Sequence, residues 1–590
     1  MPRTCKFSQQ RRPVTFTSLL FVITMPTPSM QRNVVAACTL LVLSYSCVAQ
    51  TAPDAGSLLR ENERQQRQLP QPGPRTVPKA PAASDAGAVR ITVKSFRITG
   101  NTLIAEPALQ AVLVPWLGKE TTFTELQQAT NAIAEAYRAR GWFARPQLPA
   151  QDVSSGVIQI NIIEGRLGAV RIDDGGKALR VARGLVTDTM TARQKPGDPL
   201  NLDALDRSTN ILNDTPGLAV ATILTPGKTT GDTDAVVKVQ DKPLFSGTAT
   251  LDNQGARATG AEKLSASLTL DSPSGTGDQI ALNANTSQGS DYMKLAYTLP
   301  WGRDGARVGV SASAMRYKLL GDLASLDALG DAQTLGANAS YPLLRSGTKN
   351  INLSAALDRK SYYNEASQLA TSQKVVDVAV LILNGDMLDG LGQGGMTLWG
   401  VNLTAGRLDL SANAANQTAD RIGAQTEGSY QKLGYNIARL QRLSDTTTLW
   451  ASFSGQSAGK NLDSSEKFSL GGPSGVRAYP LSEGSGDDGW LATLELRRNL
   501  TPEFQVNAFY DHGQIKQSHD NAYTGAPVVN EGSLKGFGFG VSWSKSGNFA
   551  VRASLAQRIG DNPFASVLNG TDGDGSLNRT RLWVSAVKFF

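Results

Sequence analysis

Apolar and polar residues alternate in many stretches of the chain between residue 244 and Phe590. In the clearest examples every second residue is apolar and the residues between are mostly small or charged; these are 264–271, 351–358, 490–497 and 537–544. Successive side chains of a β-strand point to opposite faces, so the pattern predicts strands with one apolar face. Strands of a soluble β-sandwich also alternate between apolar and polar residues. Here, however, the pattern recurs across the whole second half of the chain. Because a transmembrane barrel needs an apolar face for lipid and a polar lumen, we predict an antiparallel transmembrane β-barrel over 244–590.

Two shorter segments with a mixed α+β pattern precede the predicted barrel. In 90–165, a strand at 91–98 is followed by a helix that begins at Thr122, where Thr122 and Glu125 have the spacing of a capping box. A second strand follows at 158–162. In 166–243 a strand, one helix and two strands are predicted, the last two at 218–225 and 233–240. We therefore expect two consecutive β-α-β-β modules.

The first 49 residues have the features of an export signal. Arg32 precedes the uncharged stretch 34–48, and small residues at Cys47 and Ala49 predict cleavage between Ala49 and Gln50. A membrane anchor is the alternative, but the stretch is shorter than the ~20 apolar residues that a spanning helix needs. Met30 is a more natural start than Met1, because translation from Met1 would place a long extra segment ahead of an ordinary signal peptide.

After the signal, residues 50–69 predict a short amphipathic helix and 70–89 a proline-rich linker. Five prolines between Pro70 and Pro81 exclude helix and sheet there and favour a semi-rigid spacer. A disordered tail is the alternative for the helix.

Composition excludes several classes of site. The formal net charge of +7 comes mostly from residues 1–49, which hold five basic residues and no acidic one, so the rest is nearly neutral and nucleic acid is not an expected partner. All three cysteines also lie in 1–49, which excludes disulfides and thiolate sites from the mature chain. With only two histidines, His512 and His519, we expect no metal site, and no cofactor is predicted.

An enzyme is the weakest interpretation. Residues 455–459 read Gly-Gln-Ser-Ala-Gly but lack the strand-turn-helix context of a nucleophilic serine. Asp511 and His512 are neighbours in a predicted strand, so their side chains point to opposite faces and cannot form a relay. We expect no catalytic residue.

Two motifs then resemble a known family. Residues 468–480 contain Gly475-Val476-Arg477-Ala478-Tyr479 and are followed by Asp487-Asp488. Residues 509–513 contain Phe509, Asp511 and Gly513 at alternate positions. Together with the opening of the first module at 93–102, these motifs resemble the TpsB family of two-partner secretion transporters of the outer membrane. Ala478 replaces the glycine that is usual there, which raises the question of whether this position needs a positive φ.

The resemblance implies a barrel of about 16 strands, a plug helix at 50–69 and two periplasmic POTRA domains, at 90–165 and 166–243. It also implies that the loop at about 455–489 folds into the lumen, where Arg477 pairs with Asp511. The implied function is export of a large β-helical TpsA-type exoprotein across the bacterial outer membrane without ATP, after capture by the POTRA domains. Outer-membrane lipid and the barrel assembly machinery are further expected partners. A barrel-assembly factor of the Bam type and a passive porin are the alternatives.

Overall fold

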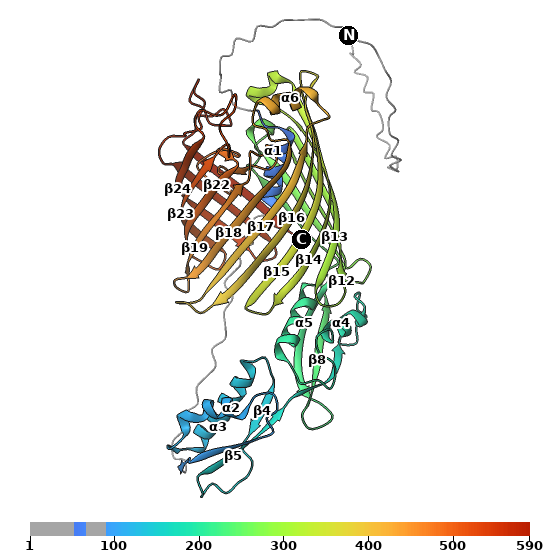
Figure 1. Cartoon of the computed structure of the whole chain (residues 1–590), viewed down its shortest axis with the longest axis vertical. Helices are drawn as coiled ribbons and strands as arrows, with labels where there is room; N and C mark the ends of the chain where they lie inside the picture. Colours follow the sequence, from blue (N-terminus) through green and yellow to red (C-terminus); the bar gives the residue numbers. More distant parts are fainter. Residues whose placement is uncertain (1–51, 67–89) are drawn as a thin grey trace, which may run out of the picture. The chain divides into compact units, whose positions relative to one another are not determined.

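The computed structural model describes residues 52–66 and 90–590. The predicted signal peptide, its cleavage site at Ala49 and Gln50, and the predicted linker at 70–89 lie outside the described residues. The C-terminal part is a closed barrel of antiparallel strands (Figure 1). Its sixteen strands are β9 (Phe245–Asp252), β10 (Lys263–Asp271), β11 (Gln279–Ser287), β12 (Ser290–Trp301), β13 (Ala306–Lys318), β14 (Ala328–Arg345), β15 (Lys349–Ala366), β16 (Leu369–Asp389), β17 (Gly395–Asp409), β18 (Gly428–Arg442), β19 (Thr447–Ala458), β22 (Asp488–Asn499), β23 (Phe504–Lys516), β24 (Glu531–Lys545), β25 (Phe549–Arg558) and β26 (Thr580–Phe589).

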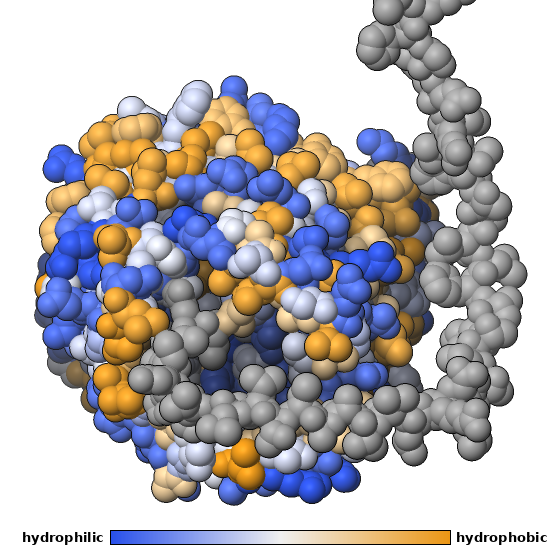
Figure 2. Space-filling view, turned by 90° about the horizontal axis from the view of Figure 1, so that it is seen from above, coloured by the Kyte–Doolittle hydropathy of each residue, from blue (hydrophilic) through white to orange (hydrophobic). Residues whose placement is uncertain are grey.

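The alternation in the sequence separates the two faces of this barrel, which confirms the predicted fold class. Leu264, Leu357 and Phe539 are exposed on the outer wall, whereas Asp511 faces inward and is buried. Seen from above in Figure 2, apolar residues gather along parts of the circumference and polar residues surround a central hollow. The strands β9 and β26 pair from Asp252↔Ser585 to Thr248↔Phe589 and close the barrel.

Short helices occupy three of the connections in the barrel, namely η2 (Arg257–Thr259), η3 (Gly321–Leu326) and α6 (Ala414–Ile422). None of the helices in the described residues is long and apolar enough to span a membrane.

The first α+β module begins at β1. Its elements are β1 (Ile91–Thr92), β2 (Ser95–Thr99), α2 (Glu106–Leu113), η1 (Val114–Trp116), β3 (Glu120–Thr121), α3 (Phe123–Arg138), β4 (Ala144–Gln147) and β5 (Val157–Glu164). The sheet order is β2-β5-β4, and residues of α2, α3 and the sheet share one apolar core. The predicted capping box is present: Thr122 Oγ1 accepts from the Glu125 N–H, and the Glu125 carboxylate accepts from the Thr122 N–H.

The second module repeats this arrangement with a sheet in the order β6-β8-β7. Its elements are β6 (Arg166–Asp173), α4 (Arg183–Met190), α5 (Leu202–Asp214), β7 (Leu218–Pro226) and β8 (Asp232–Asp241). The predicted β-α-β-β order was wrong, because each module has two helices between its first and second long strands. The missed helices, α2 and α4, have eight residues each, which is too short for a clear helical period and depends on packing for stability.

Contacts of the second module identify one end of the barrel. Asp304, in the turn between β12 and β13, accepts hydrogen bonds from Arg193 (2.9 and 2.8 Å), Arg207 (2.9 Å) and the Tyr341 hydroxyl (2.6 Å). Arg345, at the end of β14, forms a bidentate pair with Asp214 of α5 at 2.6 and 2.7 Å. We call this end of the barrel the module end, and the other the far end.

The first module contains one carboxylate whose ionisation stabilises the fold. Glu164 accepts hydrogen bonds from the backbone N–H groups of Thr102 (2.7 Å) and Leu103 (2.8 Å), from the Thr102 hydroxyl and from the Tyr137 hydroxyl (2.7 Å). Burial raises the pKa of Glu164, but these hydrogen bonds outweigh burial, so the pKa lies below its usual value.

We expect Glu164→Gln to loosen the 100–104 loop, with a local cost of roughly 1–2 kcal/mol, because the charged acceptor of four hydrogen bonds is lost. In the wild type, the stabilisation should be complete above the unfolded pKa of about 4.3 and should fall as the pH drops through the lowered folded pKa. Hydrogen exchange at the Thr102 and Leu103 amides of the full-length protein in detergent, corrected for intrinsic rates, measures both effects. Equal protection in the variant and the wild type at pH 7 would contradict the assignment.

Candidate functional site

A long connection between β19 and β22 folds into the barrel lumen. It covers residues 459–487, and a short hairpin forms its stem, where β20 (Phe468–Ser469) pairs with β21 (Ser485–Gly486). The prediction of about 455–489 was too long at both ends, since residues 455–458 pair with β18 and Asp488 and Gly489 pair with β23. The apolar alternation is interrupted by the small and polar residues Gly455, Ser457 and Gly489. Their backbones nevertheless pair with neighbouring strands of the barrel.

The tip of the loop carries the predicted Gly475–Tyr479 motif and is packed against the wall. Val476, Ala478 and Tyr479 are fully buried, in a cluster with Phe509 and other wall residues. A Cβ added to Gly475 would lie 1.8 Å from the Leu470 carbonyl oxygen, so only glycine fits there. Ala478 is not among the residues with positive φ, so the backbone accepts its methyl group without strain.

Glycines in the wall make room for this tip. A Cβ on Gly536 would lie 2.7 Å from the Ala478 Cβ, and one on Gly513 would lie 2.5 Å from the Leu470 side chain. Gly513 of the predicted wall motif therefore serves packing rather than electrostatics.

Arg477 is the electrostatic centre of the site. Its Nε and Nη2 donate to the two carboxylate oxygens of Asp511 at 2.8 and 2.9 Å, and its backbone N–H also donates to Asp511, at 3.2 Å. Nη1 donates to Glu495 at 2.8 Å. The guanidinium carbon lies 3.3 Å from the centroid of the Phe509 ring. All five donors of arginine form a fixed fork, so one guanidinium can hold two carboxylates and stack on a ring at once.

The structure thus brings together Arg477, Asp511 and Phe509, and adds partners that sequence reasoning missed. Glu495 is held from its other side by Arg497 at 2.7 Å, and the Trp583 indole N–H donates to the Arg477 carbonyl at 2.8 Å. The alternation in 490–497 does place Glu495 on the inward face of its strand, but no local pattern predicts which cation it meets.

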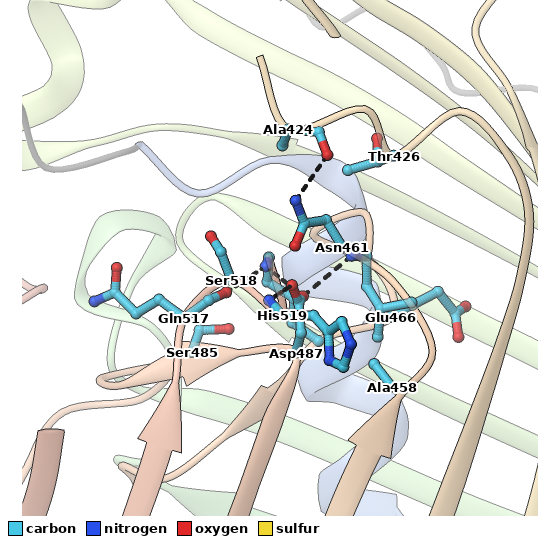
Figure 3. A network of polar contacts seen from close by, with 12 residues as sticks. Ala424, Thr426, Ala458, Asn461, Glu466, Ser485, Asp487, Gln517, Ser518 and His519 are labelled. Atoms are coloured by element: carbon cyan, nitrogen blue, oxygen red, sulfur yellow. Dashed lines mark hydrogen bonds and ion pairs between the residues drawn. The ribbon is translucent and has the colours of Figure 1, made fainter. Parts of the chain in front are cut away.

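The base of the loop is anchored at the far end of the barrel by a polar network (Figure 3). Asp487 is fully buried and accepts from the N–H groups of Leu462 (3.1 Å) and His519 (2.9 Å) and from Lys467 Nζ (2.5 Å). Asn461 donates to the Ala424 carbonyl at 2.9 Å. Neighbouring connections of the barrel therefore hold the base of the loop, while Asp511 and Glu495 hold its tip.

The N-terminal helix α1 (Ala55–Gln66) lies inside the barrel beside β13, β14 and β15 (Figure 1). Its apolar residues Ala55, Leu58 and Leu59 are buried against the inner wall.

Two arginines of α1 form hydrogen bonds to the backbone of the 459–487 loop. Arg60 donates to the carbonyls of residues 464 and 467 at 2.9 and 2.8 Å, and Arg64 to those of 471 and 474 at 3.4 and 3.3 Å.

A buried ion cluster fixes the first turn of α1 at the far end. Lys374 Nζ of β16 lies 3.0 Å from the Asp54 carboxylate and 2.8 Å from that of Asp463 in the loop. One wall lysine thus connects the start of the helix to the loop.

The helix and the loop leave a polar cavity of about 870 Å³ along the wall made by β9–β11 and β22–β26. Its lining consists mainly of hydroxyl and amide side chains, and Arg477, Glu495 and Arg497 contribute the charges on the loop side. The cavity lies beside the loop and α1, and residues of both line it.

A family model for haemolysin secretion/activation proteins of the ShlB/FhaC/HecB type matches residues 231–543, which is more than half of the chain. The chain belongs to the ShlB/FhaC/HecB family. A second family model, for POTRA domains of the ShlB type, matches residues 91–165.

Relatives and solved structures agree with the membership of the ShlB/FhaC/HecB family. The heme/hemopexin transporter protein HuxB of Haemophilus influenzae is 27% identical over 93% of this chain and 97% of its own length. The outer membrane transporter CdiB of Dickeya dadantii is 25% identical over 75% of this chain and 80% of its own length. The structure of CdiB from Escherichia coli covers 92% of this chain and 100% of its own with a TM-score of 0.68 at 21% identity, which shows the same fold.

The family resemblance predicted from the motifs is therefore confirmed, and with it the function class. The protein is an outer-membrane transporter of two-partner secretion, with POTRA domains in the periplasm and a secreted TpsA-type exoprotein as its partner. It is a secretion pore and not an enzyme. The module end of the barrel is the periplasmic end, and the far end is the extracellular one.

We expect Arg477→Lys to loosen the loop tip, because lysine cannot bind two carboxylates in a fork or stack on Phe509. Losing about 1.5–3 kcal/mol of charge-assisted hydrogen bonding should speed exchange of the Val476 and Tyr479 amides at least tenfold. Hydrogen exchange of the purified transporter in detergent measures this change.

Arg359→Lys is the matched control, because Arg359 forms an exposed pair with Asp377 on the outer wall at 3.4 Å. Such exposed ion pairs contribute little to the free energy of unfolding. Equal exchange rates at the loop tip in both variants and the wild type would contradict the anchoring role of Arg477.

Proposed function

We propose that the Arg477–Asp511 pair anchors a gate, and that export requires this pair to open. The loop carries Arg477 at its tip, and the charges that hold it lie on the adjacent strands β22 and β23. Charge-assisted hydrogen bonds of about 1.5–3 kcal/mol are enough to close the loop at rest. They are also weak enough for an incoming polypeptide to displace.

The helix α1 is the second obstruction in this proposal. Because Arg60 and Arg64 donate to the loop backbone, release of the loop tip would weaken the hold on the helix, and withdrawal of the helix would weaken the hold on the loop. The loop and α1 would therefore leave the polar cavity together rather than in independent steps.

Capture of the exoprotein would occur at the POTRA domains. In the second module β6 and β7 are the two edges of the sheet, and their unpaired backbone groups can bind an extended segment by β-augmentation. The exoprotein would then pass through the lumen unfolded and fold outside, so that backward movement becomes unfavourable. The β-helical form of the cargo and its identity as an adhesin or haemolysin belong to this proposal.

The remaining expected partners follow from the barrel wall. Its exposed apolar residues would contact outer-membrane lipid, and its insertion would use the barrel assembly machinery. The near-neutral charge outside residues 1–49 gives no support for a nucleic-acid partner.

Cells that express the transporter with its exoprotein test the gate. We expect the wild type to release the exoprotein into the medium, and Arg477→Ala and Asp511→Ala to reduce release at least severalfold while the barrel assembles normally. The physical reason is that a loop without its anchor no longer returns to one position after each displacement. Immunoblots of medium and cells give the export, and heat-modifiable gel mobility gives barrel assembly.

Wild-type export by both variants would refute the gate. Impaired insertion of unrelated porins on deletion of the gene, with export intact, would instead favour a barrel-assembly role.

A further inference from the structure

A groove of about 980 Å³ crosses the outer wall of the barrel over β14–β18. Its lining includes Leu335 and Leu357, which are 67% and 63% exposed on that wall. Val378 and Tyr430 alternate with the outward residues of their strands, and their side chains are packed in the apolar cluster around α1. The groove therefore opens away from the lumen, toward the membrane.

Cross-strand pairing arranges the outward residues of the groove in two rows. The upper row, nearer the extracellular end, carries the charges and consists of Leu335, Arg359, Asp377, Arg407 and Ser429. The lower row is mostly small and consists of Ala337, Leu357, Ala379, Ala405 and Gln431. Because three of these five side chains are methyl groups, the wall is hollowed along the lower row.

The upper row lies where the apolar band of the barrel ends. On β16 the outward residues from Ala379 to Met387 are alanine, leucine, leucine, glycine and methionine. They cover about 26 Å along the tilted strand, which is enough to cross most of the roughly 25 Å apolar band of such barrels. Asp377 is the next outward residue of β16 on the extracellular side. The charged row is therefore at the level of the lipid headgroups of the outer leaflet.

Arg407 is a cation in this row without a neutralising partner. Asp377 is paired with Arg359 at 3.4 Å, and no carboxylate of the described residues lies within ion-pair distance of Arg407. Asp409, the next outward residue of β17, attracts Arg407 from further away and accepts a hydrogen bond from the Ser411 N–H at 2.9 Å. The guanidinium of Arg407 is thus exposed with its donors available.

Lys460 brings a second cation to the same groove. It belongs to the base of the 459–487 loop, and its Nζ donates to the Glu427 carbonyl at 2.8 Å. A carbonyl does not neutralise the ammonium group, which has two further donors. The groove thus combines two uncompensated cations at the headgroup level with an apolar hollow beneath them.

We propose that this groove binds one phosphorylated lipid of the outer leaflet. Arg407 and Lys460 would hold a phosphate, since guanidinium and ammonium groups are both phosphate ligands, and basic pockets on a membrane wall bind anionic headgroups. The acyl chains would lie on the alanines of the lower row and on the exposed leucines below it, Leu381, Leu403 and Leu433. The apolar hollow favours a lipid over a free phosphate, because only a lipid would fill it. This inference rests on the outer-membrane location and not on the proposed gate.

Three variants separate the roles of charge, shape and general lipid contact. The cation variant, Arg407→Gln/Lys460→Gln, removes the two uncompensated charges. The groove variant, Ala379→Phe/Ala405→Phe, fills the lower row with residues that suit a strand and keeps the charges. The control variant, Arg316→Gln/Lys535→Gln, removes two outward cations of β13 and β24, outside the groove.

Native mass spectrometry of the full-length transporter in detergent, titrated with each probe, measures the binding. The probes are diphosphorylated lipid A, phosphatidylethanolamine and inorganic phosphate, and heat-modifiable gel mobility gives barrel assembly. We expect the wild type to bind lipid A at least tenfold more tightly than either other probe. The cation variant and the groove variant should each bind lipid A at least tenfold more weakly than the wild type, and the control variant within threefold of it.

Three results would overturn the inference. Equal binding of lipid A and phosphatidylethanolamine by the wild type would show ordinary contact with lipid along the wall. An equal loss in the cation and control variants would show that any outward cation serves. Wild-type affinity in the groove variant would show that the acyl chains do not occupy the hollow. Export is not measured in this experiment, so failure of the gate is a separate result.

Discussion

The need to pair every backbone N–H and C=O group inside a membrane determines the rest of this structure. An open sheet edge in lipid would leave several such groups unsatisfied, each at a cost of several kcal/mol, so the sheet must close on itself. Closure of sixteen strands produces a lumen too wide for wall side chains to fill. Such a lumen is either left as a water-filled channel or occupied by other parts of the chain, and here the 459–487 loop and α1 occupy part of it.

The two inserted parts are held by different kinds of interaction. The loop tip is held by a buried arginine whose two carboxylate partners, Asp511 and Glu495, come from adjacent strands. Such a pair is costly to break on one side only, because the remaining charge is left buried without a partner. The helix is held by an apolar contact, by the wall lysines Lys374 and Lys360 and by its own two arginines. When the helix alone separates, Lys374 keeps Asp463 and Lys360 keeps Glu466 as partners, so no lone charge is left in an apolar environment. This difference makes the loop tip costlier to release than the helix.

Sequence reasoning located the barrel, the helix with its capping box at Thr122 and the inward orientation of Asp511, because each depends on a local period or spacing. The motifs also placed Arg477 and Asp511 in one site by family resemblance. The first helix of each module escaped prediction, since α2 and α4 are held by contacts with residues far away in the chain. The same holds for the partners that Glu495 and Trp583 meet, and for the apolar cluster around α1, whose members come from many strands and from the connections between them.

The hydrogen bonds from α1 to the loop backbone affect how the sequences of such transporters can diverge. Arg60 and Arg64 donate mainly to main-chain carbonyls of the loop, and those acceptors are the same whatever side chains the loop carries. Residues of the loop can therefore be exchanged in evolution without loss of this contact, provided that the course of its backbone is kept. A chimaera that received the loop of a distant family member would still offer the helix the same row of oxygen atoms.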